Sequence, residues 1–303
     1  MKSGRLLVIS VATVPEPELM RRAREVAAAL DHELFICCLL DDAGLPPALP
    51  GQKERVRNIR KKLVSRCKNA LEQVLDEMHA AGVAARGYVK TTDSVKTAAL
   101  EMVEKKSPSL VMICRRSHTR FEEAVLAGDD FAIIRACPVP IWVVNPAKGT
   151  GDKIVGAVDR PGQDHAASLD DMILDNVSQL ARKLGKQSHA LHTFGDAGLS
   201  RPLEQPAADP DDDMGASRYD RRMRRIIDFG LAHGVPRERV HIHEGKLVNA
   251  LEEMSGPMNA DLIVLGARSR GRLRRMLSGS AAERIVQRVK SDVLILKDRD
   301  GEP

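Results

Sequence analysis

Apolar residues occur along the chain in two patterns that alternate regularly. Short continuous apolar runs, such as residues 6–10 and 34–40, are typical of strands that are buried on both faces of a sheet. Between such runs lie longer segments with helical spacing, and in residues 53–81 the apolar positions are Val56, Ile59, Leu63, Cys67, Leu71, Val74 and Met78. Strands that alternate with crossover helices predict an α/β fold with a parallel, doubly wound sheet.

The same order of elements occurs twice, which predicts two tandem copies of one fold. The tetrapeptide Asp-Ala-Gly-Leu follows an apolar run at residues 42–45 and again at 196–199, each time before a basic helical segment. The predicted strands are 6–10, 34–40, 84–90, 110–114 and 140–144 in the first copy, and 154–158, 188–194, 240–243, 262–265 and 293–296 in the second. The predicted helices are 18–30, 53–81, 94–105, 129–136, 166–184, 218–233, 247–258 and 281–289. A segment with Pro and Gly at 145–152 joins the copies, so we expect domains at 1–147 and 152–303.

Composition agrees with two globular domains and narrows the classes of protein. The chain has 303 residues, of which 43% are hydrophobic and 29% charged. Its five cysteines show no CxxC spacing, which indicates reduced, buried thiols in a cytoplasmic protein; they are Cys37, Cys38, Cys67, Cys114 and Cys137. No apolar stretch is long enough for a membrane helix, and Pro15-Glu16-Pro17 breaks the first apolar run early. We therefore expect a first strand rather than a signal peptide, and no membrane partner.

Ligands of a doubly wound sheet bind beyond the carboxyl ends of the strands, where the strand order reverses. In the second copy, Asp159 closes the first strand, and the segment LGARSRGRLRRMLSGS at 265–280 follows the fourth. Gly266 would let the backbone approach a ligand, and Gly279-Ser280 would open a helix whose free N–H groups suit a phosphate. Most of the arginines in this segment are interpreted as a solvated loop, and only Arg268 is proposed as a contact.

The spacing Gly266-x2-Ser269-x9-Gly279-Ser280 resembles the nucleotide-binding motif of the universal stress protein family, Gly-x2-Gly-x9-Gly-Ser/Thr. The two copies, with a weakly matching motif in the first, are similar to the tandem E type of that family. The resemblance implies two five-stranded sheets with strand order 3-2-1-4-5, of the kind seen in adenine nucleotide alpha hydrolases. It also implies that the halves pack as an intramolecular pseudo-dimer, and it leaves a further homodimer open.

The family resemblance further implies that the second domain binds ATP, with Mg²⁺ accompanying the nucleotide. Base and ribose would be held by Ala157, Val158 and Asp159, and the rest of the nucleotide by Gly266, Arg268, Ser269, Gly279, Ser280 and Ala281. Ser269 departs from the family pattern, which has glycine there. In the first copy Ser10 replaces the aspartate, Cys114 and Ser117 replace the two glycines, and Asp129 lies near the helix start, so we expect a degenerate nucleotide site.

These observations predict a cytoplasmic stress-response regulator that binds an adenine nucleotide and is not an enzyme, because nothing nominates a general base beside the phosphate site. The alternative is an adaptor that acts through protein partners or another ligand, and a slow ATPase is a third reading. Nucleic-acid binding is disfavoured, because aromatic residues make up only 3% and the net charge is only +5. His241 and His243 are expected to be ordinary strand residues, and residues 196–217 a lid or an exposed loop.

Overall fold

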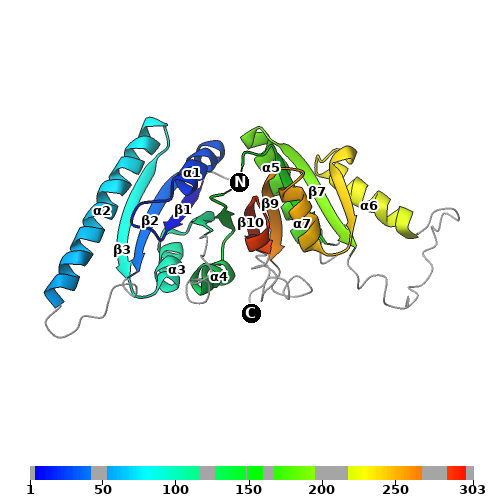
Figure 1. The fold of residues 1–303 in the computed structure, drawn as a ribbon. Coiled ribbons are helices and arrows are strands. Elements are labelled where there is room, and N and C mark those ends of the chain that lie inside the picture. The colour runs from blue at the N-terminus through cyan, green and yellow to red at the C-terminus, as the bar shows by residue number, and fades with distance from the viewer. Residues whose placement is uncertain are drawn as a thin grey trace. The chain divides into compact units, whose positions relative to one another are not determined.

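The computed structural model describes residues 4–41, 53–115, 127–147, 149–159, 167–194, 218–267 and 285–297. The chain divides into two compact units, Met1–Ala147 and Lys148–Pro303 (Figure 1). Each unit contains one parallel sheet with helices packed against it. None of the helices in the described ranges is long and apolar enough to span a membrane.

The first unit alternates strands and helices in the order expected of a doubly wound fold. Its elements are β1 (Arg5–Ser10), α1 (Pro17–Leu30), β2 (Glu33–Asp41), α2 (Lys53–Ala80), β3 (Ala85–Thr92), α3 (Val95–Lys106), β4 (Leu110–Cys114), α4 (Ala127–Ala136) and β5 (Ile141–Val144). The strands pair in the order β3-β2-β1-β4-β5, with every pairing parallel. The reversal of order between β1 and β4 places the ends of these two strands at the switch point.

The second unit repeats the arrangement. Its elements are β6 (Lys153–Val158), α5 (Ala167–Leu184), β7 (Gln187–Phe194), α6 (Arg218–Ala232), the 3-10 turn η2 (Arg237–Arg239), β8 (Val240–Glu244), α7 (Leu247–Ser255), β9 (Ala260–Ala267) and β10 (Asp292–Lys297). The strands pair in the order β8-β7-β6-β9-β10, again in parallel. A helical turn at 285–288 lies before β10. The predicted fold class, with strand order 3-2-1-4-5 in each copy, is confirmed.

Burial on both faces explains why the central strands are continuously apolar. Every residue of β1 after Arg5 is buried, as are all of β4 and β9 up to its last residue. In the second unit α5 packs directly against Gly156, where a Cβ would come within 2.9 Å of Ile173 and of Val177. The glycine therefore makes room for two large side chains on the helix.

One predicted helix end is wrong. The helical pattern predicted a helix to residue 258, whereas α7 ends at Ser255. Gly256 follows as the C-cap, and its N–H donates to the Glu252 carbonyl at 2.9 Å. Pro257 comes next, and the ring of a proline restricts the residue before it away from helical geometry. The freed residues let β9 begin at Ala260, two positions earlier than predicted.

Candidate functional site

Asp159 lies directly after β6, at the carboxyl end of the central strand of the second sheet. Its side chain is exposed, and its backbone N–H donates to Oδ1 of Asp170 at 3.3 Å. Asp170 belongs to the first turn of α5 and is only 2% exposed. A carboxylate at that place also interacts favourably with the positive end of the helix dipole. The turn that presents Asp159 is thus held from behind by a buried carboxylate.

The two residues before Asp159 have different environments. Ala157 is half-buried, whereas the side chain of Val158 is buried. The Val158 carbonyl accepts a hydrogen bond from Nδ1 of His192 at 3.0 Å, and His192 is only 1% exposed. The structure therefore offers Ala157 and Asp159 at the strand end, whereas Val158 contributes its side chain to the core.

Gly266 lies near the end of β9, and packing against α5 is enough to require a glycine there, whether or not a ligand binds. A Cβ at Gly266 would lie 2.6 Å from Cδ2 of Leu169, which is a buried residue of α5. The sequence-based reason for this glycine, close approach of the backbone to a ligand, therefore has a rival in helix packing. Leu169, Asp170 and His192 were not among the predicted residues, because only the folded arrangement brings α5 and β7 to this strand end.

Carboxylates at this strand end would interact differently with the phosphates of a nucleotide and with its adenosine. Asp159 is exposed and Asp170 is buried behind it, so two carboxylates lie at this strand end. Phosphate groups are repelled by carboxylates, whereas ribose hydroxyls and the amino group of adenine can donate to them. The other predicted residues, Arg268, Ser269, Gly279, Ser280 and Ala281, lie outside the described residues, as does the segment 196–217.

The corresponding strand end of the first unit is engaged internally. Ser10 is completely buried, and its hydroxyl donates to Oε2 of Glu16 at 2.6 Å. Cys114 is also buried, and Arg115, directly after it, donates from Nη2 to Oδ1 of Asn145 at 2.7 Å. These contacts use the polar groups that would otherwise face a ligand. The two remaining positions of the degenerate motif differ in status, since Ser117 lies outside the described residues and Asp129 falls within α4.

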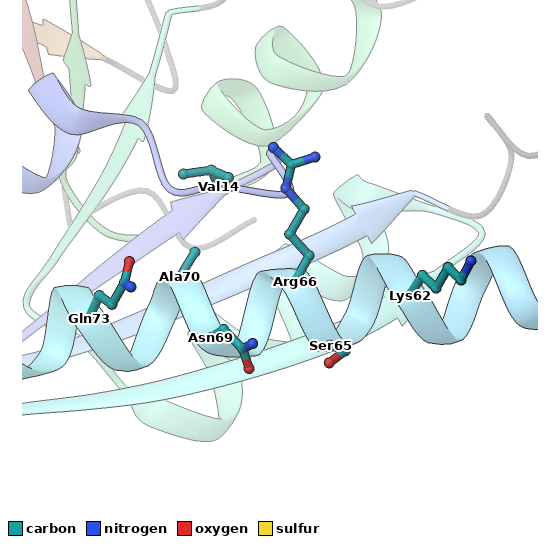
Figure 2. Close-up of a pocket in the computed structure, with 7 residues that line it drawn as sticks. All are labelled: Val14, Lys62, Ser65, Arg66, Asn69, Ala70 and Gln73. Atoms are coloured by element: carbon teal, nitrogen blue, oxygen red, sulfur yellow. The ribbon is translucent and has the colours of Figure 1, made fainter.

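A shallow groove of about 520 Å³ lies between α2 and the loop after β1 in the first unit. Figure 2 shows the guanidinium of Arg66 directed toward Val14, while the side chain of Lys62 lies further along the helix. Carboxamides complete the polar lining, from Asn69 and Gln73. This groove is built by the face of one helix, so it differs from the glycine-loop site expected in the second unit.

Two histidines of the second unit form a stacked pair between β7 and β8. The rings of His189 and His241 are 5.2 Å apart and nearly parallel, and Nδ1 of His189 lies 2.9 Å from Nε2 of His241. Burial and then the neighbouring His241 lower the pKa of His189 to about 4. Burial, followed by the charge of His243, likewise lowers the pKa of His241.

The cysteines and histidines provide no metal centre within the described part of the chain, where no group of three or more His, Cys, Asp or Glu side chains has a suitable arrangement. All five cysteines are buried, and none of them is part of a disulfide. Burial raises the pKa of the Cys37 thiol to about 11, so at neutral pH this thiol is protonated and a poor nucleophile.

Comparison with known protein families identifies the second unit. The model of the universal stress protein family matches residues 151–297. Universal stress protein E of Photorhabdus laumondii is 24% identical over 199 residues, which cover 62% of this chain and 61% of that protein. The homologous protein of Haemophilus influenzae is 20% identical over 258 residues, covering 82% of this chain and 81% of its own length. Residues 151–297 therefore match the universal stress protein family, and the resemblance predicted from the sequence is confirmed.

Solved structures with the same fold extend over nearly the whole chain. A protein of unknown function from Pseudomonas aeruginosa PAO1 has a TM-score of 0.68 at 20% identity, covering 98% of this chain and 93% of its own. A universal stress protein from Archaeoglobus fulgidus has a TM-score of 0.65 at 17% identity, covering 99% and 98%. At such identities these likenesses show the fold, which is therefore shared by both units.

Proposed function

We propose that this protein is a tandem stress-response regulator whose second domain, residues 152–303, binds an adenine nucleotide. Asp159 carries the proposal, because it is an exposed carboxylate held at the switch point of a universal stress protein fold. Asp159 and the half-buried Ala157 would contact the adenosine end, whose hydroxyl and amino groups can donate to the exposed Asp159 carboxylate. Gly266, Arg268, Ser269, Gly279, Ser280 and Ala281 would hold ribose and phosphates, with ATP and Mg²⁺ as the expected ligands.

The proposed orientation follows from charge. Two carboxylates at the end of β6 oppose phosphate at that point, so the phosphates would extend toward the segment that follows β9. That segment carries Gly279-Ser280, where backbone N–H groups at a helix start would receive them. The carboxylates lie at the adenosine end of this proposed arrangement and not beside the phosphates, so the proposed role is regulation through binding and not catalysis.

An adaptor that binds no nucleotide is the second candidate, because the packing at Gly266 accounts for this glycine without a ligand. Because Leu169 occupies the space of a Cβ there, this glycine is required for folding in either case. The adaptor would act through protein partners or a different ligand. A slow ATPase is the third candidate. It would require ATP turnover that is lost in the variants that lose nucleotide binding.

The test measures ATP binding to the full chain by calorimetry in the presence of Mg²⁺, together with mass spectrometry of nucleotide retained through purification. We expect Asp159→Ala and Gly279→Val each to weaken binding by about tenfold or more, since each removes or blocks a direct contact. Asp175→Ala is the matched control, because Asp175 is an exposed carboxylate on the same domain away from the strand ends. Binding that is equal in all four proteins would reject the site, and no saturation at millimolar ATP would favour the adaptor. ATP turnover that both substitutions abolish would instead support the slow ATPase.

A further inference from the structure

A second hollow lies at the opposite end of the second sheet, where the strands begin. It has a volume of about 550 Å³ and is formed by α5, the end of α6, and the residues that open β7 and β8. Volumes of this size are typical of small-molecule sites. Three cationic side chains contribute to its lining, namely Arg182, Lys186 and Arg239, against one carboxylate, Asp175.

The single carboxylate is already engaged. Oδ1 of Asp175 lies 2.8 Å from Nδ1 of His233, and Nε2 of the same ring lies 2.9 Å from Oδ1 of Asp171. His233 directly follows α6, so these bonds fasten the end of α6 to α5. The Ser178 hydroxyl adds a bond to the His233 carbonyl at 2.5 Å. The part of the lining formed by Asp175, Ser178 and His233 is therefore fixed by its own hydrogen bonds.

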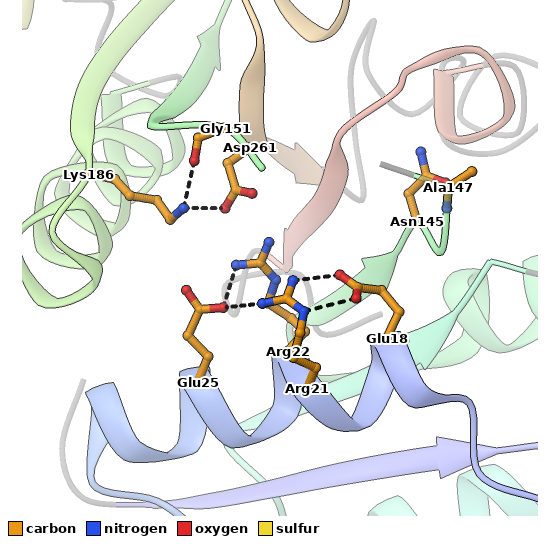
Figure 3. A network of polar contacts seen from close by, with 9 residues as sticks. All are labelled: Glu18, Arg21, Arg22, Glu25, Asn145, Ala147, Gly151, Lys186 and Asp261. Carbon is orange, nitrogen blue, oxygen red and sulfur yellow. Dashed lines mark hydrogen bonds and ion pairs between the residues drawn. The ribbon is translucent and has the colours of Figure 1, made fainter. Parts of the chain in front are cut away.

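Lys186 is also held in place, at the base of the hollow. Its ammonium donates to the Gly151 carbonyl at 2.8 Å and lies 3.0 Å from Oδ2 of Asp261, and the side chain is only 13% exposed (Figure 3). An ammonium group has three donors. The remaining positive charge of the hollow comes from Arg182, which is exposed, and Arg239, which is half-buried. Neither guanidinium forms a hydrogen bond or ion pair with another residue in the part of the chain that the structure describes.

The first unit has different residues at the positions that correspond to Arg182, Gln187 and Arg239. Left-handed residues end α1 and α5, at Asp31 and Gly185, so counting back three residues sets Ala28 against Arg182. Counting forward two sets Glu33 against Gln187. Phe35 pairs with Arg86 in the first sheet, and Ala190 pairs with Val240 in the second. By the same count His189 corresponds to Phe35. Arg239, which directly precedes Val240, therefore corresponds to Arg86.

The consequence for charge is direct. Arg86 is neutralised in the first unit by an ion pair of 2.9 Å with Glu33. In the second unit the position of Glu33 carries Gln187, and the side-chain amide of Gln187 donates to Asp152 at 3.1 Å. Arg239 thus loses its carboxylate, and Arg182 adds a second guanidinium where the first unit has Ala28. Lys186 is already paired with Asp261, so the two guanidinium groups supply the unpaired positive charge of the hollow. Guanidinium groups are suited to a phosphate, which they bind in a bidentate manner.

We propose that the hollow lined by Arg182, Lys186 and Arg239 binds a small molecule through a phosphate group. The site is separate from the proposed nucleotide site, which lies beyond the carboxyl ends of β6 and β9. Its ligand class is a phosphorylated metabolite or an oligophosphate, and inorganic pyrophosphate is the simplest probe of the shared chemistry.

The experiment titrates the full-length protein with pyrophosphate by calorimetry at constant ionic strength, which keeps screening equal among samples. We expect saturable binding that is weakened about tenfold or more by Arg182→Ala and by Arg239→Gln, because each removes a charged hydrogen-bond donor. Arg237→Gln is the control, since it removes the same charge two residues from Arg239 outside the lining of the hollow. Circular dichroism of each variant verifies the fold.

Gly279→Val separates this proposal from the proposed function, because it blocks the segment proposed to receive the nucleotide phosphates and should leave pyrophosphate binding to the hollow unchanged. Three outcomes would overturn the phosphate site: no saturation at millimolar pyrophosphate, equal affinity in all variants, or a loss in Arg237→Gln as large as in the other two. The last result would mean that pyrophosphate responds only to net charge. Competition by glucose 6-phosphate, but not by glucose, would extend the proposal from oligophosphates to phosphomonoesters, and failure of that competition would restrict it to oligophosphates.

Discussion

The two units differ sharply in the ring pair that lies between their second and third strands. In the first unit Phe35 and Tyr88 stack with ring centres 6.3 Å apart, and the Lys106 ammonium lies 4.0 Å above the Tyr88 ring and donates to its hydroxyl. In the second unit the same register positions carry His189 and His241, stacked at 5.2 Å. The same backbone arrangement thus holds two rings that cannot become positively charged in the first unit and two imidazoles that can in the second.

The same contrast continues at the next position of the edge strand. Lys90 on β3 pairs with Glu101 of α3, and in the second unit His243 on β8 lies 3.5 Å from Glu253 of α7. A lysine remains charged at every physiological pH, whereas a histidine does not. At these positions the first unit has a lysine and the rings of Phe35 and Tyr88, whereas the second has three imidazoles, so the two halves should respond differently to acid.

The largest expected effect is loss of stability of the second unit on acidification. His189 is 4% exposed, and its Nε2 has no hydrogen-bond partner among the described residues, so protonation would bury a charge and an unsatisfied donor. Its pKa falls from 6.5 to about 4 on folding, so the unfolded chain binds more protons between these values. The stabilisation is complete above pH 6.5 and decreases as the pH falls toward 4, by about 3 kcal/mol in total.

Hydrogen exchange, corrected for the intrinsic effect of pH, measures this difference unit by unit. Between pH 7 and pH 4.5 we expect protection of β7 and β8 to fall by about a hundredfold more than protection of β2 and β3. The double variant His189→Phe/His241→Tyr places the ring pair of the first unit in the second and should remove most of that excess. An excess that persists in the variant would assign the acid sensitivity to other groups.

The order of the elements could be predicted from the sequence, whereas the contacts that support the end of β6 could not. The periodic apolar pattern was sufficient for the order of elements and for most boundaries, because a doubly wound fold repeats one local pattern. Asp170 and His192 could not be predicted as supports of the β6 end, since each acts across a contact between elements distant in the chain. Gly266 was found for its place in a motif, but its contact with Leu169 depends on how closely α5 approaches β9.

A second comparison concerns how each unit fills the space between its central strand and the first helix. Leu6 and Ile154 pair with Leu110 and Leu262 respectively, so Val8 corresponds to Gly156. Counting back from the left-handed residue after each helix sets Ala23 against Val177, and both are completely buried. The first unit therefore has the large residue on the strand, and the second has it on the helix.

Gly156→Val should destabilise the second unit by about 2 kcal/mol, because overpacking a filled core typically costs 1–3 kcal/mol. Val177→Ala alone should cost about 1 kcal/mol through the cavity that it leaves. The double variant copies the arrangement of the first unit and should be more stable than the sum of the two changes predicts, with a coupling of about 1 kcal/mol. Hydrogen exchange in β6 and β7 measures each value, and strictly additive effects would show that the two positions do not share this space.

The smallest expected effect concerns the start of the helix after the third strand. Ser94 caps α3, its hydroxyl accepting from the Thr97 N–H at 3.3 Å, whereas Lys246 at the same place before α7 forms no side-chain cap. Lys246→Ser should therefore stabilise α7 by about 1 kcal/mol, and Ser94→Ala should destabilise α3 by a similar amount. Lys246→Ala is the control, because it removes the unfavourable charge from the helix start without supplying an acceptor. Protection of the α7 amides that rises equally in Lys246→Ser and Lys246→Ala would mean that the charge, and not the missing cap, weakens this helix.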